Sequence, residues 1–158
     1  MRRIFAAAGI EFYAHELIDT RSVVLPFGGR NFACLLWDHG LVLPDASSED
    51  LCQLLLRTGC RYVVCGGPGC EAWHDLVDLV FVDEHLEASD VELDRAHVMT
   101  TWHSNELPDD VAFFFVYNTN FDDITFDRYL ILHLGTGPLA QVIEDAVIAY
   151  AGHLTRTS

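Results

Sequence analysis

Short segments with strand character alternate with helical patterns along most of this chain, and this order limits the possible folds more than any other feature. Each segment is brief and rich in aliphatic, β-branched or aromatic residues, as expected of strands buried in a parallel sheet. The predicted strands are NFACLLW (31–37), CRYVVC (60–65), HVMTTW (97–102) and RYLILHL (128–134). Three such strands separated by helices would already make a parallel α/β arrangement.

The intervals between the strands carry helical patterns. In the first helix, ASSEDLCQLLLRTG (46–59), we expect Ser47 to cap the start and Gly59 to end it in a left-handed conformation. The other predicted helices are CEAWHDLVDLVFVDEHL (70–86), ELPDDVAFFFVYNT (106–119) and GPLAQVIEDAVIAYAGHL (137–154). A shorter helix followed by a strand at 79–82 is an alternative for the second, and ASDVELDRA (88–96) is expected to be a polar connector.

This order predicts one α/β domain over residues 1–158, with a mostly parallel sheet covered by helices on both faces. A three-layer fold of the flavodoxin-like or Rossmann-like kind is expected. Residues 1–19 are predicted to add an N-terminal helix on the outside. A run at about 21–25 is a possible antiparallel hairpin strand, joined to 31–37 through the turn PFGG.

The charge balance is strongly acidic, with 24 Asp and Glu against nine Arg and no Lys, a net charge of −15. Residues 71–127 hold 15 acids and one base, Arg95. Such a surface repels nucleic-acid phosphates and anionic lipid, so neither nucleic acid nor membrane is an expected partner. It attracts a basic protein instead, although acidity also serves solubility alone. The aromatic run AFFFVY (112–117) is predicted to be core, with a homodimer interface as the alternative.

The five cysteines are not predicted to form disulfides, because their number is odd and a domain of this size is stable without such cross-links. Reduced thiols and an N-terminal apolar stretch that Glu11 breaks after about eight residues predict a cytoplasmic protein without a signal peptide. Cys60, Cys65, Cys70 and His74 have metal-like spacing. However, Cys60 and Cys65 are five residues apart on a strand, so opposite faces are expected. No metal and no cofactor are predicted.

Ligands of open α/β sheets bind beyond the carboxyl ends of the strands. Here glycine-rich turns follow two strands, and polar or aromatic residues follow the others. The predicted ligand-binding residues are Asp38, Gly66, Gly67, Gly69, Trp102, Gly135, Thr136 and Gly137. Glycine lets backbone N–H groups approach a phosphate, but tight turns also use glycine for geometry alone.

The same strand ends hold four candidates for catalysis. Cys65 is the candidate nucleophile, His39 or His103 the base, and Glu106 the carboxylate beside it. His133, inside an apolar strand, is expected to be a hydrogen-bonded core histidine.

Two functions remain open at this point. The first is an accessory, regulatory or immunity-type protein that binds a basic partner. The second is an enzyme, resembling a Cys/His hydrolase, that handles a small ligand or nucleotide at the strand ends. Whether the chain is an enzyme is not decided by its sequence.

Overall fold

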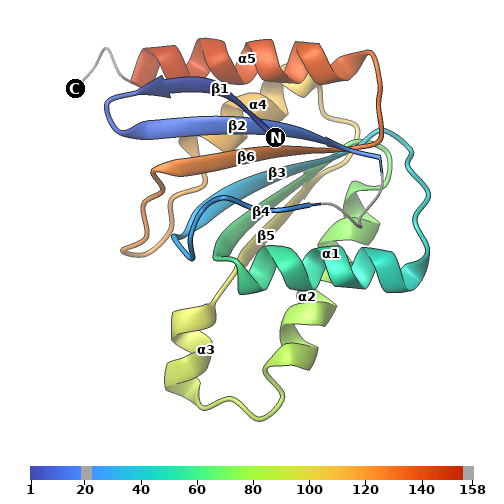
Figure 1. The fold of residues 1–158 in the computed structure, drawn as a ribbon, viewed down its shortest axis with the longest axis vertical. Helices are drawn as coiled ribbons and strands as arrows, with labels where there is room; N and C mark the ends of the chain where they lie inside the picture. The colour runs from blue at the N-terminus through green and yellow to red at the C-terminus, as the bar shows by residue number, and fades with distance from the viewer. Residues whose placement is uncertain (19–22, 155–158) are drawn as a thin grey trace.

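A six-stranded sheet forms the middle of the molecule, with the strand order β1-β2-β6-β3-β4-β5 (Figure 1). The computed structural model describes residues 1–18 and 23–154. The strands are β1 (Arg2–Ala7), β2 (Ile10–Leu17), β3 (Phe32–Asp38), β4 (Cys60–Gly66), β5 (Met99–His103) and β6 (Arg128–Leu134). β1 is antiparallel to β2, and every other neighbouring pair is parallel. The predicted α/β class with a mostly parallel sheet is confirmed.

Within the described residues, five helices accompany the sheet. They are α1 (Asp45–Arg57), α2 (Cys70–Glu84), α3 (Asp90–Ala96), α4 (Pro108–Tyr117) and α5 (Leu139–Leu154). Buried side chains of α1 and α2 pack on one face of the sheet, and those of α4 and α5 pack on the other. Two hydrophobic clusters therefore lie on opposite sides of the strands, as a sheet between two helical layers requires.

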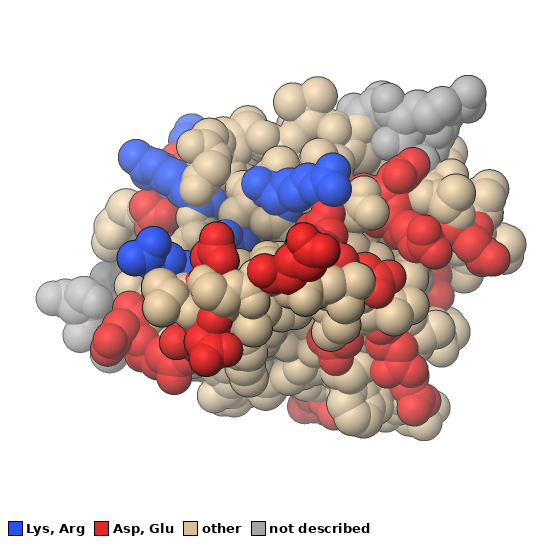
Figure 2. All heavy atoms as spheres, turned by 90° about the horizontal axis from the view of Figure 1, so that it is seen from below, with Lys and Arg blue, Asp and Glu red and all other residues tan. Residues whose placement is uncertain are grey.

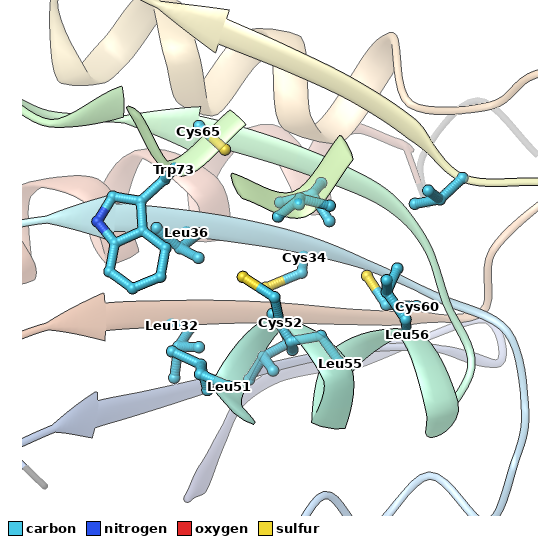
Figure 3. Close-up of a cluster of buried hydrophobic side chains, with 14 of the residues drawn as sticks. Cys34, Leu36, Leu51, Cys52, Leu55, Leu56, Cys60, Cys65, Trp73 and Leu132 are labelled. Carbon is cyan, nitrogen blue, oxygen red and sulfur yellow. The ribbon is translucent and has the colours of Figure 1, made fainter. Parts of the chain in front are cut away.

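The cluster beneath α1 shows how the sequence pattern produces this packing (Figure 3). Leu51 and Leu55 of α1 belong to the same cluster as Leu36 of β3 and Leu132 of β6, and all four are at most 2% exposed. Leu51 and Leu55 are one helical turn apart and therefore share a face. Burying one such side chain stabilises a fold by about 1.5–3 kcal/mol.

The N-terminal segment is a β-hairpin, so the prediction of an N-terminal helix is wrong. Ala8 and Gly9, with φ of 51° and 83°, form the turn between β1 and β2. Two successive residues with positive φ are typical of the tight turns that join antiparallel strands. Phe12 and Ala14 alternate with less buried neighbours along β2, and this two-residue period is the signal of a strand.

The antiparallel strand of the sheet is β1, not the run predicted at about 21–25. Residues 21–22 lie outside the described residues, and 23–25 form no strand. The turn at PFGG is present, with the Arg30 N–H donating to the Phe27 carbonyl over 3.0 Å. Phe27 is buried and packs on Phe32, with the two rings 4.6 Å apart.

The four predicted helices are confirmed, with differences at their ends. α1 begins after Pro44, so Ser47 lies within the helix and is not its cap. Gly59 has φ of 109° and follows the helix as predicted. α2 runs without interruption through 79–82, so the alternative strand there is wrong; its buried face includes Trp73, Val77 and Val80.

The segment predicted as a polar connector contains α3. Ser89 accepts a hydrogen bond from the Glu92 N–H, and the Glu92 carboxylate accepts one from the Ser89 N–H over 2.8 Å. This reciprocal capping box stabilises the start of a helix without hydrophobic packing. None of the residues of α3 is buried, which explains why a search for apolar periodicity does not detect the helix.

Candidate functional site

The carboxyl ends of the parallel strands lie along one edge of the sheet, and the connections change direction there between β3 and β6. β3 leads into α1 on one face, whereas its neighbour β6 leads into α5 on the other. Ligands of open α/β sheets bind at such a switch point. The loops 38–41 and 135–138 meet at this place and define the first candidate site.

A chain of polar side chains runs from the switch point into the protein. Nε2 of His39 lies 2.9 Å from Nδ1 of His133. The other ring nitrogen of His133 is 3.4 Å from Oε1 of Glu144, whose Oε2 accepts a hydrogen bond from Arg2. His133 is fully buried and Glu144 is 2% exposed. Burying ionisable groups costs free energy unless they have partners, so this chain of four groups is an unusual feature of the core.

The environment keeps His133 neutral. Burial, together with the neighbouring His39 and Arg2, lowers the pKa of His133 to about 4. Burial also lowers the pKa of His39, although Asp38 opposes this effect. Nε2 of His133 makes no hydrogen bond in the described residues, but the Glu144 carboxylate 3.4 Å away favours the single ring proton on this nitrogen. In that tautomer Nδ1 accepts the hydrogen bond from His39. Nδ1 of His39 is then left as an acceptor at the switch point, which is the property that a general base needs.

The expectation that His133 is a hydrogen-bonded core histidine is confirmed, but its connection to Glu144 and Arg2 was not predicted. One sequence signal was available. Glu144 stands among the buried residues of α5, next to Ile143 and one turn from Ala140 and Val147. A carboxylate on the apolar face of a helix indicates an internal partner.

The turn after β4 is filled by the end of β3. A β-carbon at Gly66 would lie 2.6 Å from the ring of Trp37. At Gly67 it would overlap the backbone of Asp38, and at Gly69 the carboxylate of Asp38. These glycines therefore permit close packing between two strand ends, which is the geometric alternative left open above. Contact of their N–H groups with a ligand stays a prediction.

The turn after β6 has the same relation to the loop after β3. A β-carbon at Gly137 would lie 2.5 Å from Nδ1 of His39, and one at Gly135 would lie 3.2 Å from the β-carbon of Leu41. Thr136, between the two glycines, is exposed. Glycine at 137 is thus what allows the ring of His39 to reach His133.

The structure does not bring Cys65 and His103 together as nucleophile and base. Cys65 lies in the hydrophobic cluster beneath α1 and α2. Its side chain is fully buried, and burial raises the pKa of the thiol well above its ordinary value. His103 lies on the other face, with its ring 4.6 Å from that of Phe114 on α4. A protonated thiol that faces away from the histidine has neither property of an activated nucleophile.

The predicted neighbours His103 and Glu106 do form a pair. Nδ1 of His103 is 2.9 Å from a carboxylate oxygen of Glu106, and Nε2 is 3.3 Å from the hydroxyl of Thr101. The pair lines a cavity of about 380 Å³, to which Trp37 and Cys70 also contribute. This cavity lies at the same edge of the sheet as the switch point.

Trp102 lies apart from this cavity because neighbouring residues of a strand point to opposite faces. Its ring contacts that of His74 on α2, with centroids 4.5 Å apart, and 48% of the residue is exposed. Trp102 and His103 therefore cannot contact one small ligand from the same side of the sheet. The aromatic residue beside the cavity is Trp37, which the sequence did not indicate.

The cysteines lie differently from the expectation in one respect. A shift of register between Phe32 and Ala33 of β3 opposite Cys60 changes the alternation along β4, so Cys60 and Cys65 lie in the same buried cluster. The prediction of opposite faces is wrong for this reason. Among residues 1–18 and 23–154, no three His, Cys, Asp or Glu side chains form a group that could hold a metal ion.

A comparison with models of protein families identifies the family to which the chain belongs. Residues 13–150 match the model described as Domain of unknown function (DUF7684). The chain belongs to the DUF7684 family. No curated protein and no solved structure matches it. Of the polar chain described above, His39, His133 and Glu144 lie within the matched DUF7684 region, whereas Arg2 and the rest of β1 precede it. In the described part of this DUF7684 protein, no helix is both long enough and apolar enough to cross a membrane.

Proposed function

We propose that the protein acts by binding a basic protein partner through its acidic surface, as an accessory, regulatory or immunity-type protein of the cytoplasm. The observation that carries this proposal is the unequal pairing of charges. Most described arginines form ion pairs with carboxylates of the same chain, whereas many acids of residues 71–127 pair with no arginine of the described residues. The location in the cytoplasm is supported by the five cysteines, all of which are free and buried.

Five of the seven described arginines form ion pairs with carboxylates. The pairs are Arg2–Glu144, Arg3–Glu11, Arg30–Asp127, Arg57–Glu84 and Arg128–Glu11. Their positive charge is therefore largely neutralised within the fold. Residues 71–127 hold 15 acids and one base, and among these acids only Glu84 and Asp127 pair with a described arginine. The remaining acids leave a negative field that accelerates association with a positively charged protein.

The space-filling view from below shows the distribution (Figure 2). Acidic side chains spread across this face, whereas the arginines lie in its left and upper central parts. Nucleic acid and anionic membrane are disfavoured partners of such a surface, because like charges repel. A homodimer through the exposed Phe113 of α4 is compatible with the proposal, since that residue is 46% exposed and packs beside Tyr117.

The proposal is tested with a partner captured from the source cells on the immobilised protein and then purified. The variant Asp83→Asn/Glu87→Gln/Asp94→Asn removes three exposed charges of α2, α3 and the turn between them, and is expected to slow association about tenfold at low salt. The difference should shrink as salt rises toward about 0.5 M, because screening weakens exposed charges. Stopped-flow measurement of the association rate constant checks both expectations.

The matched control is Glu49→Gln/Asp50→Asn/Asp145→Asn, which changes the net charge equally on α1 and α5. It should leave the association rate within about twofold of the native value. Equal rates for the native protein and both variants would exclude an acidic binding surface at residues 71–127. So would a captured partner that is itself acidic.

A second candidate function is favoured by the polar chain at the switch point. In this alternative the protein is an enzyme that handles a small ligand or nucleotide at the strand ends. His39 would serve as the base, and His133 and Glu144 would hold it in position. Cys65, the nucleophile predicted from the sequence, would have no role in this alternative. The doubly wound fold of the flavodoxin-like or Rossmann-like kind, which we also propose for this chain, supports a ligand at this switch point.

Native mass spectrometry of the protein purified without added ligand tests this candidate. A bound small molecule is expected, and His39→Gln should release it. The control His97→Gln changes an exposed histidine before β5 and should leave it bound. A native protein without bound ligand, or equal occupancy in the native protein and both variants, would remove His39 from any ligand site.

A further inference from the structure

The second half of α2 and the whole of α3 project from the body of the molecule (Figure 1). α2 is held by its inner face, where Cys70, Trp73, Val77 and Val80 are buried. α3 has no buried residue at all. The outer surface of α2 is therefore a helical face that nothing in the described fold covers.

Three large apolar side chains lie along this outer face. Leu79 and Val82 are each 55% exposed, and Leu86, in the turn just after the helix, is 74% exposed. Leu79 and Val82 are three residues apart on one side of α2, and Leu86 extends the apolar surface into the turn that follows the helix. Isolated exposed apolar residues need no explanation, but a group of them at the exposed side and end of a helix is the kind of surface on which a partner helix docks.

Acidic residues surround this apolar surface. Residues 71–94 contain nine acids and no base. Glu84 is paired with Arg57, and Glu92 is engaged in the cap of α3. Asp83 lies beside Val82, and Glu87 lies beside Leu86; both are exposed. A partner that covers the apolar surface therefore has to place positive charges at its edges.

We propose that the outer face of α2 binds an amphipathic helix of a partner protein whose apolar side covers Leu79, Val82 and Leu86 and whose Lys and Arg flank that side. This assignment rests on the proposed function and specifies where and by which contacts the basic partner binds. The apolar centre supplies the affinity, and the charged edges supply orientation and speed of association.

The surrounding charge decides between the possible occupants of this face. A second copy of the chain would bring Asp83, Glu87 and their neighbours against the same residues, and such like-charge contacts are costly. An anionic membrane would meet the same repulsion. A basic helix satisfies both features of the face, because it removes the apolar surface from water and neutralises the acids beside it.

The test uses a synthetic leucine–lysine peptide whose leucines share one helical face, together with a scrambled peptide of the same composition. We expect the full-length protein to bind the amphipathic peptide at least about tenfold more tightly than the scrambled one, by fluorescence anisotropy at physiological salt. Leu79→Ser/Val82→Ser should weaken this binding by about tenfold or more, because truncating central apolar anchors has effects of this size.

Val142→Ser is the matched control, since Val142 is an apolar residue of α5 with 50% exposure. It should leave the affinity unchanged. Thermal unfolding followed by circular dichroism checks that the variants remain folded, which is expected because the substituted side chains are on the surface.

The outcomes separate this inference from the proposed function. If both peptides bind equally, and only the triple acidic variant weakens them, the acidic surface functions but the apolar surface does not. If neither peptide binds, this inference fails, and the proposed function is then decided by the association rates of the captured partner. If the native protein self-associates in analytical ultracentrifugation and Leu79→Ser/Val82→Ser makes it monomeric, the face belongs to a second copy and the inference is overturned.

Discussion

Gly67→Ala is expected to destabilise the fold by about 3 kcal/mol, the sum of about 1–2 kcal/mol for the left-handed backbone and a similar cost for overlap. Gly67 has φ of 87°, and a β-carbon there would overlap the backbone carbonyl of Asp38. A backbone carbonyl cannot move away as the end of a flexible side chain can. Urea unfolding at pH 7 measures the effect as a lower midpoint with an unchanged slope.

Gly40→Ala is the control for this prediction. Gly40 has φ of 88°, but a β-carbon there would meet no atom within 4 Å. Its cost should be limited to the backbone conformation, about 1 kcal/mol. Equal losses in the two variants would show that the turn after β4 relaxes away from Asp38 and that close packing is not the reason for glycine at 67.

The second large effect is expected from acid. Between pH 6.5 and about 4 the fold should lose about 3 kcal/mol of stability through His133, because each pKa unit corresponds to about 1.36 kcal/mol. The direction follows from proton uptake. Below pH 6.5 the unfolded chain binds a proton on this ring, whereas the folded protein does not until the pH approaches 4. The stability is therefore complete above pH 6.5 and is lost as the pH falls.

His133→Gln isolates this contribution, because an amide does not titrate in this range. We expect urea unfolding at pH 7, 6, 5 and 4.5 to show a shallower loss for the variant than for the native protein. Burial also lowers the pKa of His15 and His39, but the native protein and the His133→Gln variant both retain these two histidines. Identical pH dependence in the two proteins would show that folding does not lower the pKa of His133, and a steeper loss in the variant would show that Glu144 holds the ring protonated.

The order of strands and helices from residue 31 onward could be predicted because hydrophobic periodicity is strong there. β3 and β6 are continuous buried runs, and α5 has a clear apolar stripe. The hairpin at the N-terminus was missed because β1 and β2 carry several alanines, which are good helix formers, and because the alternation along β2 is short. There, tertiary pairing overrides local propensity.

The candidate site was predictable only in part, since residues distant in the sequence build it. The rule that strand ends face one edge placed His39, His103 and Glu106 at the same edge of the sheet, and their catalytic roles stay predictions. It did not separate the two faces of a strand end, and this distinction places Cys65 and Trp102 on the side opposite His103. Nor did it reveal Glu144 and Arg2, which reach His133 from α5 and β1 through a pairing that local patterns do not encode.

Most segments of a small protein must both fill the core and form the functional surface. α3 has no buried residue, so it does not have to fill the core. Sequence change at residues 85–96 is not limited by the need to fill a core, since the sheet and its two helical layers are complete without it. A lineage can therefore alter the specificity of this projection at little cost in folding. We expect its loop length and side chains to diversify faster than the strands that support it.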